Sequence, residues 1–323
     1  LPSVAALSHP SDHGPGASLS ATAIPTPRRS RLRSPLWSEA RAALILVAPF
    51  FFLLLVAGII PMVYGIYISL EEQGGGFGLS AYERIINDFR FMDTFIHILT
   101  TLLVWIPIMM FGVVALALLV YNSPGRFGSG MRFIYFMPGA LAGIANIMLW
   151  IFLLNPGDSP LDPLWDFLGY STINEVALPG NLPWVLTGIL FLQGAGTWLV
   201  IVNGGLNGIN EEVMEAATVD GAGKVAMAWR IQLPIIRPWI GYMALLNVAY
   251  GFQLFIEVQV LGSITAGQIS PQWSPNQLSY TYAFQVLDTP AAAAMAVILL
   301  GISLTIGLIV IERSGLFKDA DVT

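Results

Sequence analysis

The sequence predicts an all-α integral membrane protein with six transmembrane helices. Hydrophobic residues make up 55% of the 323 residues and charged residues only 11%, and the mean hydropathy is +0.71, unlike a soluble domain. Six apolar runs each approach or exceed the roughly 20 residues that a helix needs to cross a bilayer core. They are about twice as long as barrel strands and do not alternate apolar with polar residues, so we expect helices.

The six expected helices divide the chain into a membrane domain with a tail at each end. They occupy residues 43–68, 95–121, 133–154, 184–206, 240–261 and 291–311. Residues 1–41 are rich in Pro, Ser and Gly, which predicts a disordered tail. The apolar run after Arg41 is too long for a cleavable signal peptide and has no clear cleavage site. We therefore expect a membrane domain over 42–311 and a short C-terminal tail over 312–323.

Lys and Arg residues predict the orientation of these helices. All but two of the 14 fall in the N-terminal tail, the second and fourth connections or the C-terminus. The exceptions, Arg84 and Arg90, lie in the first connection. Because cytoplasmic segments retain positive charge, both termini are expected in the cytoplasm.

The composition argues against several classes of site. The chain contains no Cys, which excludes disulfides, thiolate metal sites and cysteine nucleophiles. His9, His13 and His97 are too few and too scattered for a metal site. A membrane enzyme would need a cluster of acids, bases or metal ligands near one interface, and no such cluster is visible. The net charge of −6 and the lack of a compact basic patch argue against a nucleic-acid partner.

The connection between the fourth and fifth helices, residues 207–238, contains a fragment that looks like a phosphate-binding loop. The fragment is Gly221-Ala222-Gly223-Lys224. A Walker A loop would need Gly at 218 and a hydroxyl residue at 225, where this chain has Thr218 and Val225. No apolar strand precedes the fragment. We therefore expect no nucleotide or other cofactor to be bound by this chain.

The 207–238 loop instead predicts two short helices joined at a glycine pair. Residues 211–219 have helical spacing, and Gly221 with Gly223 interrupts them. A helical pattern resumes over 225–232, and Pro234 and Pro238 are expected to end it. The result would be an L-shaped cytoplasmic bracket.

At this point the residues resemble a known family. The loop is similar to the "EAA" signature of bacterial ATP-binding-cassette import permeases, in Glu215-Ala216-Ala217, Asp220-Gly221-Ala222, Ile231, Leu233-Pro234 and Pro238. The signature also lies between helices 4 and 5 in that family. Gly78 to Tyr82 and Asn155-Pro156 resemble segments of the carbohydrate-uptake type. The likeness extends over about 43–311 to the binding-protein-dependent transport system inner membrane component family.

The resemblance implies a non-catalytic permease subunit of an importer in the bacterial cell membrane, forming half of the pathway for a sugar or polyol. The implied partners are a second permease, two ATPase subunits that use ATP and magnesium, an extracytoplasmic solute-binding protein and membrane lipid. The bracket would dock into a cleft on an ATPase subunit. The residues expected to couple the two are Glu215, Ala216, Ala217, Asp220, Gly221, Ala222, Leu233 and Pro234.

Polar residues within the fourth and fifth helices are candidates for the pathway, because such residues usually face a cavity. They are Gln193, Trp198, Asn203, Asn247, Tyr250, Gln253 and Glu257. Gln253 and Glu257 are four residues apart and are expected to share a helix face. A sugar suits this set, since amides and carboxylates bind its hydroxyls and an aromatic ring packs on its apolar face. Two alternatives to a role in the pathway remain open. Glu257 would be solvated or paired across subunits, and Trp198 and Tyr250 would anchor their helices at the membrane interface.

The outer connections 155–183 and 263–290 contain no basic residue, which favours a neutral solute, and we expect them to meet the solute-binding protein. The alternative function is a self-contained secondary transporter or channel. Such proteins often contain inverted repeats, broken helices and buried charges. Here Glu257 is the one clear intramembrane charge and no repeat is visible.

Overall fold

The computed structural model describes residues 36–72, 74–122, 130–131, 134, 137, 144–265 and 267–314. Regular structure in these residues is helical, apart from an isolated antiparallel bridge between Glu71 and Phe77. The all-α class is therefore confirmed for the part of the chain that is described. The predicted tails over 1–35 and 315–323 lie outside it.

The described residues contain four helices that are long and apolar enough to cross a membrane. They are Ala43–Ser69, Phe89–Tyr121, Leu182–Asn207 and Thr289–Glu312. A fifth span is formed if Lys224–Gly251 and Ile256–Ile264, which meet at a bend of 48°, are taken together. The expected third helix, 133–154, lies partly outside the described residues. The continuous part of it that is described is α6 (Ile144–Leu154). Six spans therefore remain a prediction.

The chain divides into two compact units, residues 1–56 and 57–323. In the first unit, α1 (Leu36–Leu53) begins inside the segment 1–41 that we expected to be disordered. The π-helical turn η1 (Leu54–Ile59) follows it.

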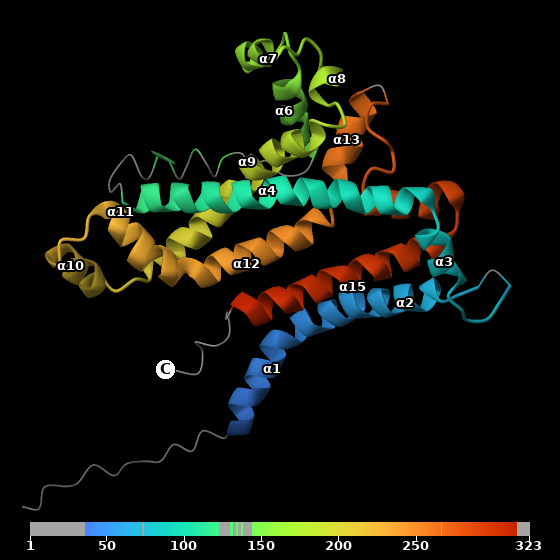
Figure 1. The fold of residues 1–323 in the computed structure, drawn as a ribbon. Helices are drawn as coiled ribbons and strands as arrows, with labels where there is room; N and C mark the ends of the chain where they lie inside the picture. Colours follow the sequence, from blue (N-terminus) through green and yellow to red (C-terminus); the bar gives the residue numbers. More distant parts are fainter. Residues whose placement is uncertain are drawn as a thin grey trace, which may run out of the picture. The chain divides into compact units, whose positions relative to one another are not determined.

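The second unit is a bundle built around α4 (Phe89–Tyr121) and α9 (Leu182–Asn207). Helix α12 (Leu233–Gly251) packs against both, and α15 (Thr289–Ser314) packs against α12 and α2 (Ile60–Ser69) (Figure 1). The side chains of Trp105, Met109 and Leu199 are fully buried among these helices. The bundle thus fixes the relative positions of α4, α9 and α12, which carry the candidate site.

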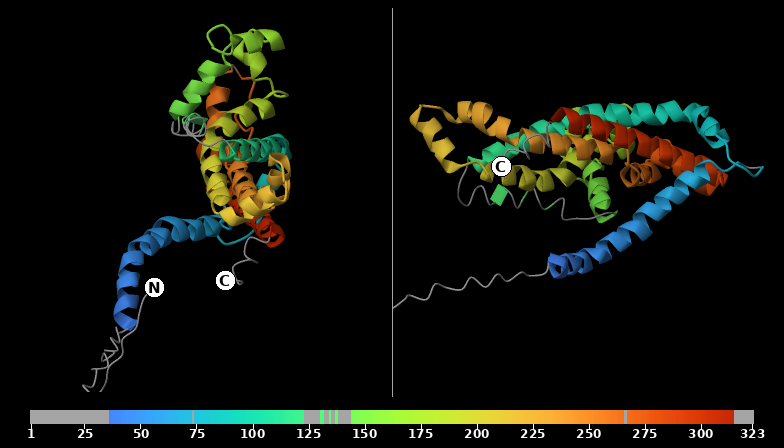
Figure 2. Two further views of the ribbon diagram at one scale, coloured as in Figure 1. Left: turned by 90° about the vertical axis from the view of Figure 1, so that its left-hand side faces the viewer. Right: turned by 90° about the horizontal axis from the view of Figure 1, so that it is seen from below.

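Shorter elements occupy the two ends of this bundle. Between α9 and α12 lie α10 (Glu211–Val219), α11 (Lys224–Met227) and the π-helical turn η2 (Ala228–Gln232). The opposite end carries α3 (Ser80–Ile86) and η3 (Tyr282–Val286) (Figures 1 and 2). The remaining connections contain α7 (Asp162–Leu168), α8 (Ile173–Val176), α13 (Ile256–Ile264) and α14 (Pro275–Thr281).

The fifth predicted helix is broken, so the expectation of one continuous helix over 240–261 was wrong. Helix α12 ends at Gly251 and α13 begins at Ile256. The Nδ2 of Asn276 donates a hydrogen bond of 3.2 Å to the Phe252 carbonyl in the break. A polar backbone group freed inside a membrane must find such a partner. The break is therefore stabilised by a residue from a distant part of the sequence.

The prediction that Pro234 and Pro238 end the second arm of the bracket was also wrong. Pro234 lies in the first turn of α12, and the helix continues through Pro238. Proline removes an N–H that would otherwise bond to a carbonyl one turn back, so each of these prolines leaves a carbonyl of the preceding turn without that partner. Within a membrane, a local π turn such as η2 gives a hydrogen-bond partner to backbone groups that have lost theirs. The second arm is thus the start of the fifth span.

Replacing Gly251 by Ala should destabilise the bundle, because α4 approaches this residue too closely for a side chain. An added Cβ would lie 2.3 Å from Leu102 Cδ2 and 3.5 Å from Trp105 Cζ3. Overpacking of this kind costs about 1–3 kcal/mol. Gly188→Ala on α9 is the control, since nothing lies within 4 Å of its added Cβ. We expect a lower melting temperature in detergent for Gly251→Ala alone, and equal values would contradict this packing.

Candidate functional site

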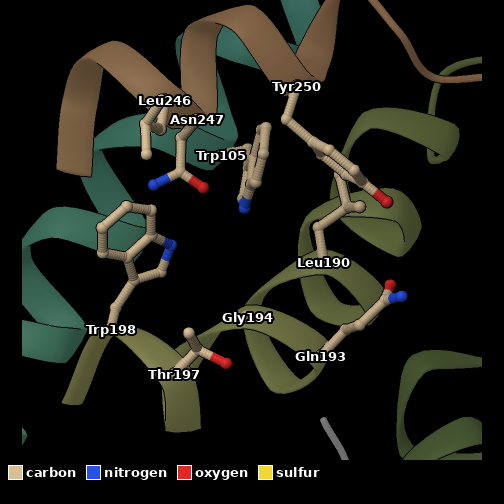
Figure 3. Close-up of a pocket in the computed structure, with 9 residues that line it drawn as sticks. All are labelled: Trp105, Leu190, Gln193, Gly194, Thr197, Trp198, Leu246, Asn247 and Tyr250. Atoms are coloured by element: carbon tan, nitrogen blue, oxygen red, sulfur yellow. The ribbon is translucent and has the colours of Figure 1, made fainter. Parts of the chain in front are cut away.

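A cavity of about 310 Å³ lies between α4, α9 and α12 (Figure 3). Four of the predicted pathway residues line it: Gln193, Trp198, Asn247 and Tyr250. The other lining residues are Trp105, Leu190, Gly194, Thr197 and Leu246. The volume is within the usual range for a small-molecule site, roughly 300–1,000 Å³.

Helical periodicity explains why these residues meet. The five cavity residues of α9 follow the spacing i, i+3, i+4, i+7 and i+8 from Leu190, which is one face of a helix. Asn247 and Tyr250 come from one face of α12, three residues apart. Gly194 presents no side chain, and an added Cβ there would lie 2.9 Å from Met109 Cε. The absence of a side chain at Gly194 therefore lets α4 and α9 approach beside the cavity.

Two polar groups of the cavity wall have partners within the chain. The Nδ2 of Asn247 donates to the Met243 carbonyl at 2.8 Å. The hydroxyl of Tyr250 donates to Oε1 of Glu257 at 3.0 Å. These bonds hold both side chains in place, and they leave Oδ1 of Asn247 as an acceptor.

Trp105 of α4 lines the cavity, although sequence reasoning did not select it. Its ring packs edge-on against that of Tyr250, with centroids 6.2 Å apart. Tryptophan in membrane helices is usually found near the interface, whereas Trp105 lies in the middle of α4. That central position is the sequence feature that would have identified it.

The other three predicted pathway residues do not line this cavity. Asn203 is buried and its Nδ2 donates to the Leu199 carbonyl at 2.9 Å. Gln253 is exposed in the break between α12 and α13. Glu257 lies on α13 and is only 6% exposed, so it is neither solvated nor on one helix face with Gln253. The shared face was wrong because the helix does not continue through Gln253.

The first arm of the bracket is the helix α10. Oδ1 of Asn210 accepts a hydrogen bond from the Glu212 N–H at 3.0 Å, which caps the helix start. Gly221 has a φ of +82°, a conformation that glycine adopts readily, and it turns the chain after α10. The glycine turn expected in the 207–238 loop is therefore present.

Most of α10 is turned outward from the chain, since every residue of the helix except Met214 and Ala217 is exposed. Glu212, Glu215, Ala216 and Val219 are all exposed and follow the i, i+3, i+4, i+7 spacing of a single face. Val219 is 88% exposed although it is apolar. Met214 packs against the core on another side, and Ala217 is half-buried. Beyond the helix, Asp220, Gly221 and Pro234 are exposed, and Ala222 and Leu233 are half-buried.

The bracket is attached to the bundle by a hydrogen bond between residues of different elements. Nδ2 of Asn122, at the end of α4, donates to Oε1 of Gln232 in η2 at 3.4 Å. Gln232 is fully buried. The second arm of the bracket therefore lies against the end of α4 as well as continuing into α12.

The opposite end of the bundle is fixed by charged residues. Arg84 of α3 donates two hydrogen bonds, of 2.8 and 3.1 Å, to Asp288 before α15. Asp88 caps α4, accepts from the Arg90 guanidinium at 2.6 Å and accepts from the Tyr282 hydroxyl at 2.7 Å. The hydrogen bond from Arg90 is the main reason that the pKa of Asp88 is lowered to about 2. Burial, and then the bond to Asp88, raise the pKa of Tyr282.

Comparison with known proteins identifies the family to which this chain belongs. Residues 74–313 match the family described as binding-protein-dependent transport system inner membrane component. The chain belongs to this family. It is accordingly a multi-pass membrane protein.

Two curated relatives align with most of the length of this chain. The sn-glycerol-3-phosphate transport system permease protein UgpA of Pectobacterium atrosepticum is 28% identical, over 86% of this chain and 95% of that protein. The multiple sugar-binding transport system permease protein MsmF of Streptococcus mutans is 25% identical, over 88% of this chain and 96% of that protein. Both relatives are transport permeases rather than enzymes.

Solved structures share the fold of this permease family member. A bacterial ABC transporter involved in the import of the acidic polysaccharide alginate matches with a TM-score of 0.74 and 18% identity, over 87% of this chain and 99% of that chain. The alginate transporter in complex with an alginate pentasaccharide-bound periplasmic protein matches with a TM-score of 0.73 and 18% identity, over 87% and 98%.

The pKa of Asp88 predicts a loss of stability in acid. Because its folded-state pKa of about 2 is below the ordinary value of 3.8, the stabilisation is complete above pH 4 and is lost as the pH falls toward 2. The loss should be on the order of 1–2 kcal/mol, allowing for solvent screening. Asp88→Asn keeps an N-cap side chain but has no charge, so its melting temperature should change less between pH 5 and pH 2.5. Equal pH slopes for the two proteins would contradict this role of Asp88.

Proposed function

We propose that this chain is the permease subunit of an ATP-driven importer and forms half of the translocation pathway for a sugar or polyol. The observation that carries the proposal is the position of the cavity. It lies between α9 and α12, and the bracket containing α10 connects these same two helices. A displacement of the bracket would therefore be transmitted directly to two walls of the cavity.

The exposed face of α10 supports docking onto a separate ATPase subunit. Ala216 is small enough to allow close helix approach, and Val219 offers apolar surface. Glu215 is an exposed carboxylate on the same face, suited to a basic group of the partner. An ion pair that becomes buried on docking contributes more than one that stays in water.

Alternating access would follow from two states of the ATPase pair. ATP binding closes the ATPase subunits around ATP and magnesium and moves the bracket of each permease. The cavity then opens to the outside, receives solute from an extracytoplasmic solute-binding protein, and returns inward after hydrolysis. Such a cycle requires that α10 makes different contacts in the two states.

The remaining partners and the orientation follow from the same proposal. A second permease supplies the other half of the pathway. Lys224, Arg230 and Arg237 are exposed near the bracket, as expected for a cytoplasmic end in contact with lipid headgroups. Arg84 and Arg90, at the opposite end, are each paired with a carboxylate. Both termini are then cytoplasmic, and the name of the relative MsmF, a multiple sugar-binding transport system permease, supports a sugar as solute.

Two observations favour the alternative of a self-contained secondary transporter. The broken fifth span and the buried Glu257 are features that such transporters often have. The family match over 74–313 favours the importer instead. Transport in liposomes without ATP and without partner subunits would support the alternative.

Glu215→Ala should uncouple transport from ATP hydrolysis without unfolding the chain. The side chain is exposed and makes no hydrogen bond within the described structure, so folding should be unchanged. If it forms a buried ion pair on docking, its loss should lower uptake about tenfold or more. The measurement is uptake and ATPase activity of the reconstituted complex. Glu83→Ala, an exposed carboxylate on α3, is the control, and normal uptake by Glu215→Ala would refute the assignment.

Gentle extraction of the chain from its native membrane should recover the partners. We expect mass spectrometry of a C-terminally tagged chain to identify one ATPase subunit type and a second permease. Recovery of this chain alone, still able to transport, would refute the importer.

A further inference from the structure

A second cavity, of about 430 Å³, lies where α4 faces the second arm of the bracket. On α4 its lining residues fall between Met110 and Leu118, and on the bracket arm they are Ala228, Trp229 and Leu233. None of the lining residues is charged, and their side chains offer no hydrogen-bonding group beyond the Trp229 indole N–H and a methionine sulfur. A sugar or a nucleotide would lose its water here without gaining partners. The cavity, called here the α4–bracket groove, therefore suits a hydrocarbon chain.

The groove opens to the surroundings of the bundle. Phe111 and Trp229 in its walls are 77% and 67% exposed. Its α4 wall covers about 12 Å of helix within the span Phe89–Tyr121, and that span ends beside the bracket. One end of the groove thus lies at membrane depth and the other at the membrane surface, where an exposed tryptophan is typical. An acyl chain of a lipid in the adjacent leaflet can enter such a groove.

Three cations lie at the surface end of the groove. Lys224, Arg230 and Arg237 are exposed and make no hydrogen bond or ion pair through their side chains within the described residues. Arg230 directly follows Trp229, and Arg237 comes one turn after Leu233 on the same face of α12. Helical side chains incline toward the N-terminus of their helix. Arg237 is therefore expected to extend back over the Leu233 turn, toward Arg230.

No carboxylate neutralises these cations along the second arm. Residues 221–256 contain no Asp or Glu, and α4 contains none after Asp93. The nearest acids along the chain, Asp220 and the glutamates of α10, precede the turn at Gly221. The net charge of the whole chain is −6, so this local excess of positive charge is distinctive. Cytoplasmic orientation alone accounts for the cations, but not for their position beside an apolar groove.

The two halves of the site match different parts of one molecule. The apolar walls would hold a hydrocarbon chain, and the cations at the surface end would hold a negative headgroup. Arginine binds phosphate oxygens through two parallel N–H groups, and each basic residue near an anionic lipid surface adds to the attraction. An apolar helix from another subunit would fill the groove but would leave the cations without a counter-ion. The charge pattern therefore favours a lipid.

We propose that the α4–bracket groove binds an anionic phospholipid, with an acyl chain against α4 and the phosphate between Arg230 and Arg237. This inference extends the lipid contact given above for the cations to a defined site with a preference for negative headgroups. It rests on the proposed position of the bracket at the membrane surface, but not on docking to an ATPase. A bound lipid would join α4 to the second arm beside the hydrogen bond between Asn122 and Gln232. It would thereby stabilise one position of the bracket.

The test is quenching of Trp229 fluorescence by lipids that carry bromine on the acyl chain. The purified chain, with any subunits that co-purify, is placed in phosphatidylcholine nanodiscs. Brominated phosphatidylglycerol or brominated phosphatidylcholine is then titrated as the minor component. The chain contains nine tryptophans, so the Trp229 signal is obtained by difference from Trp229→Phe.

Two single variants test the headgroup contacts. Arg230→Gln and Arg237→Gln each remove one positive charge from the surface end of the groove. Arg41→Gln is the matched control, because Arg41 is also an exposed cation but lies on α1, in the other compact unit.

We expect brominated phosphatidylglycerol to quench Trp229 at concentrations at least about fivefold lower than brominated phosphatidylcholine. Arg230→Gln and Arg237→Gln should each reduce this preference about fivefold or abolish it, and Arg41→Gln should retain it. Equal quenching by the two lipids would overturn the proposal, as would the absence of quenching, which would mean that protein fills the groove. An equal loss of preference in Arg41→Gln would show only general attraction of charge and would also overturn it. The uptake measurements on Glu215→Ala test the importer separately, so the two proposals can fail independently.

Discussion

The structure depends on one constraint: polar groups inside an apolar bundle must find hydrogen-bond partners close at hand. Several buried polar side chains here bond to a carbonyl one turn earlier in their own helix. Asn203, Asn247 and Thr187 all do so, at 2.6 to 2.9 Å. Such bonds make no demand on neighbouring helices, so the helices can pack through apolar and small residues alone. Where a group cannot be satisfied in this way, a residue distant in the sequence supplies the partner in one case, and a few buried atoms, Trp105 Nε1 among them, have no partner in the described residues.

The broken fifth span shows the first outcome. Its freed Phe252 carbonyl is reached by Asn276, which lies 24 residues further along the chain. Once the helix is broken there, Glu257 turns back into a buried position and accepts from Tyr250. The same break therefore positions Tyr250 in the cavity wall. The N–H of Trp105, a residue that lines the same cavity, makes no hydrogen bond in the described residues.

The two ends of the bundle differ in a way that fits a coupled transporter. The end with α3 and η3 is fixed by Arg84 with Asp288 and by Asp88 with Arg90 and Tyr282. The end with α10 is joined to α4 by a hydrogen bond between Asn122 and Gln232, and presents an exposed helix face. Helices α9 and α12 connect the firmly bonded end to the projecting end. Movement of α10 would then change the cavity while the end with α3 and η3 keeps its packing.

The sequence alone determined the membrane class, most of the helix limits and the glycine turn of the 207–238 loop. These features depend on local properties, namely the length of apolar runs and the conformational freedom of Gly221. It also selected Gln193, Trp198, Asn247 and Tyr250, because polar groups in membrane helices tend to face a cavity. Only the tertiary structure decided that the fifth span is broken, that helix continues through Pro234 and Pro238, and that Trp105 completes the cavity. Each of these depends on which groups meet across different helices, and periodicity within one helix carries no information about that.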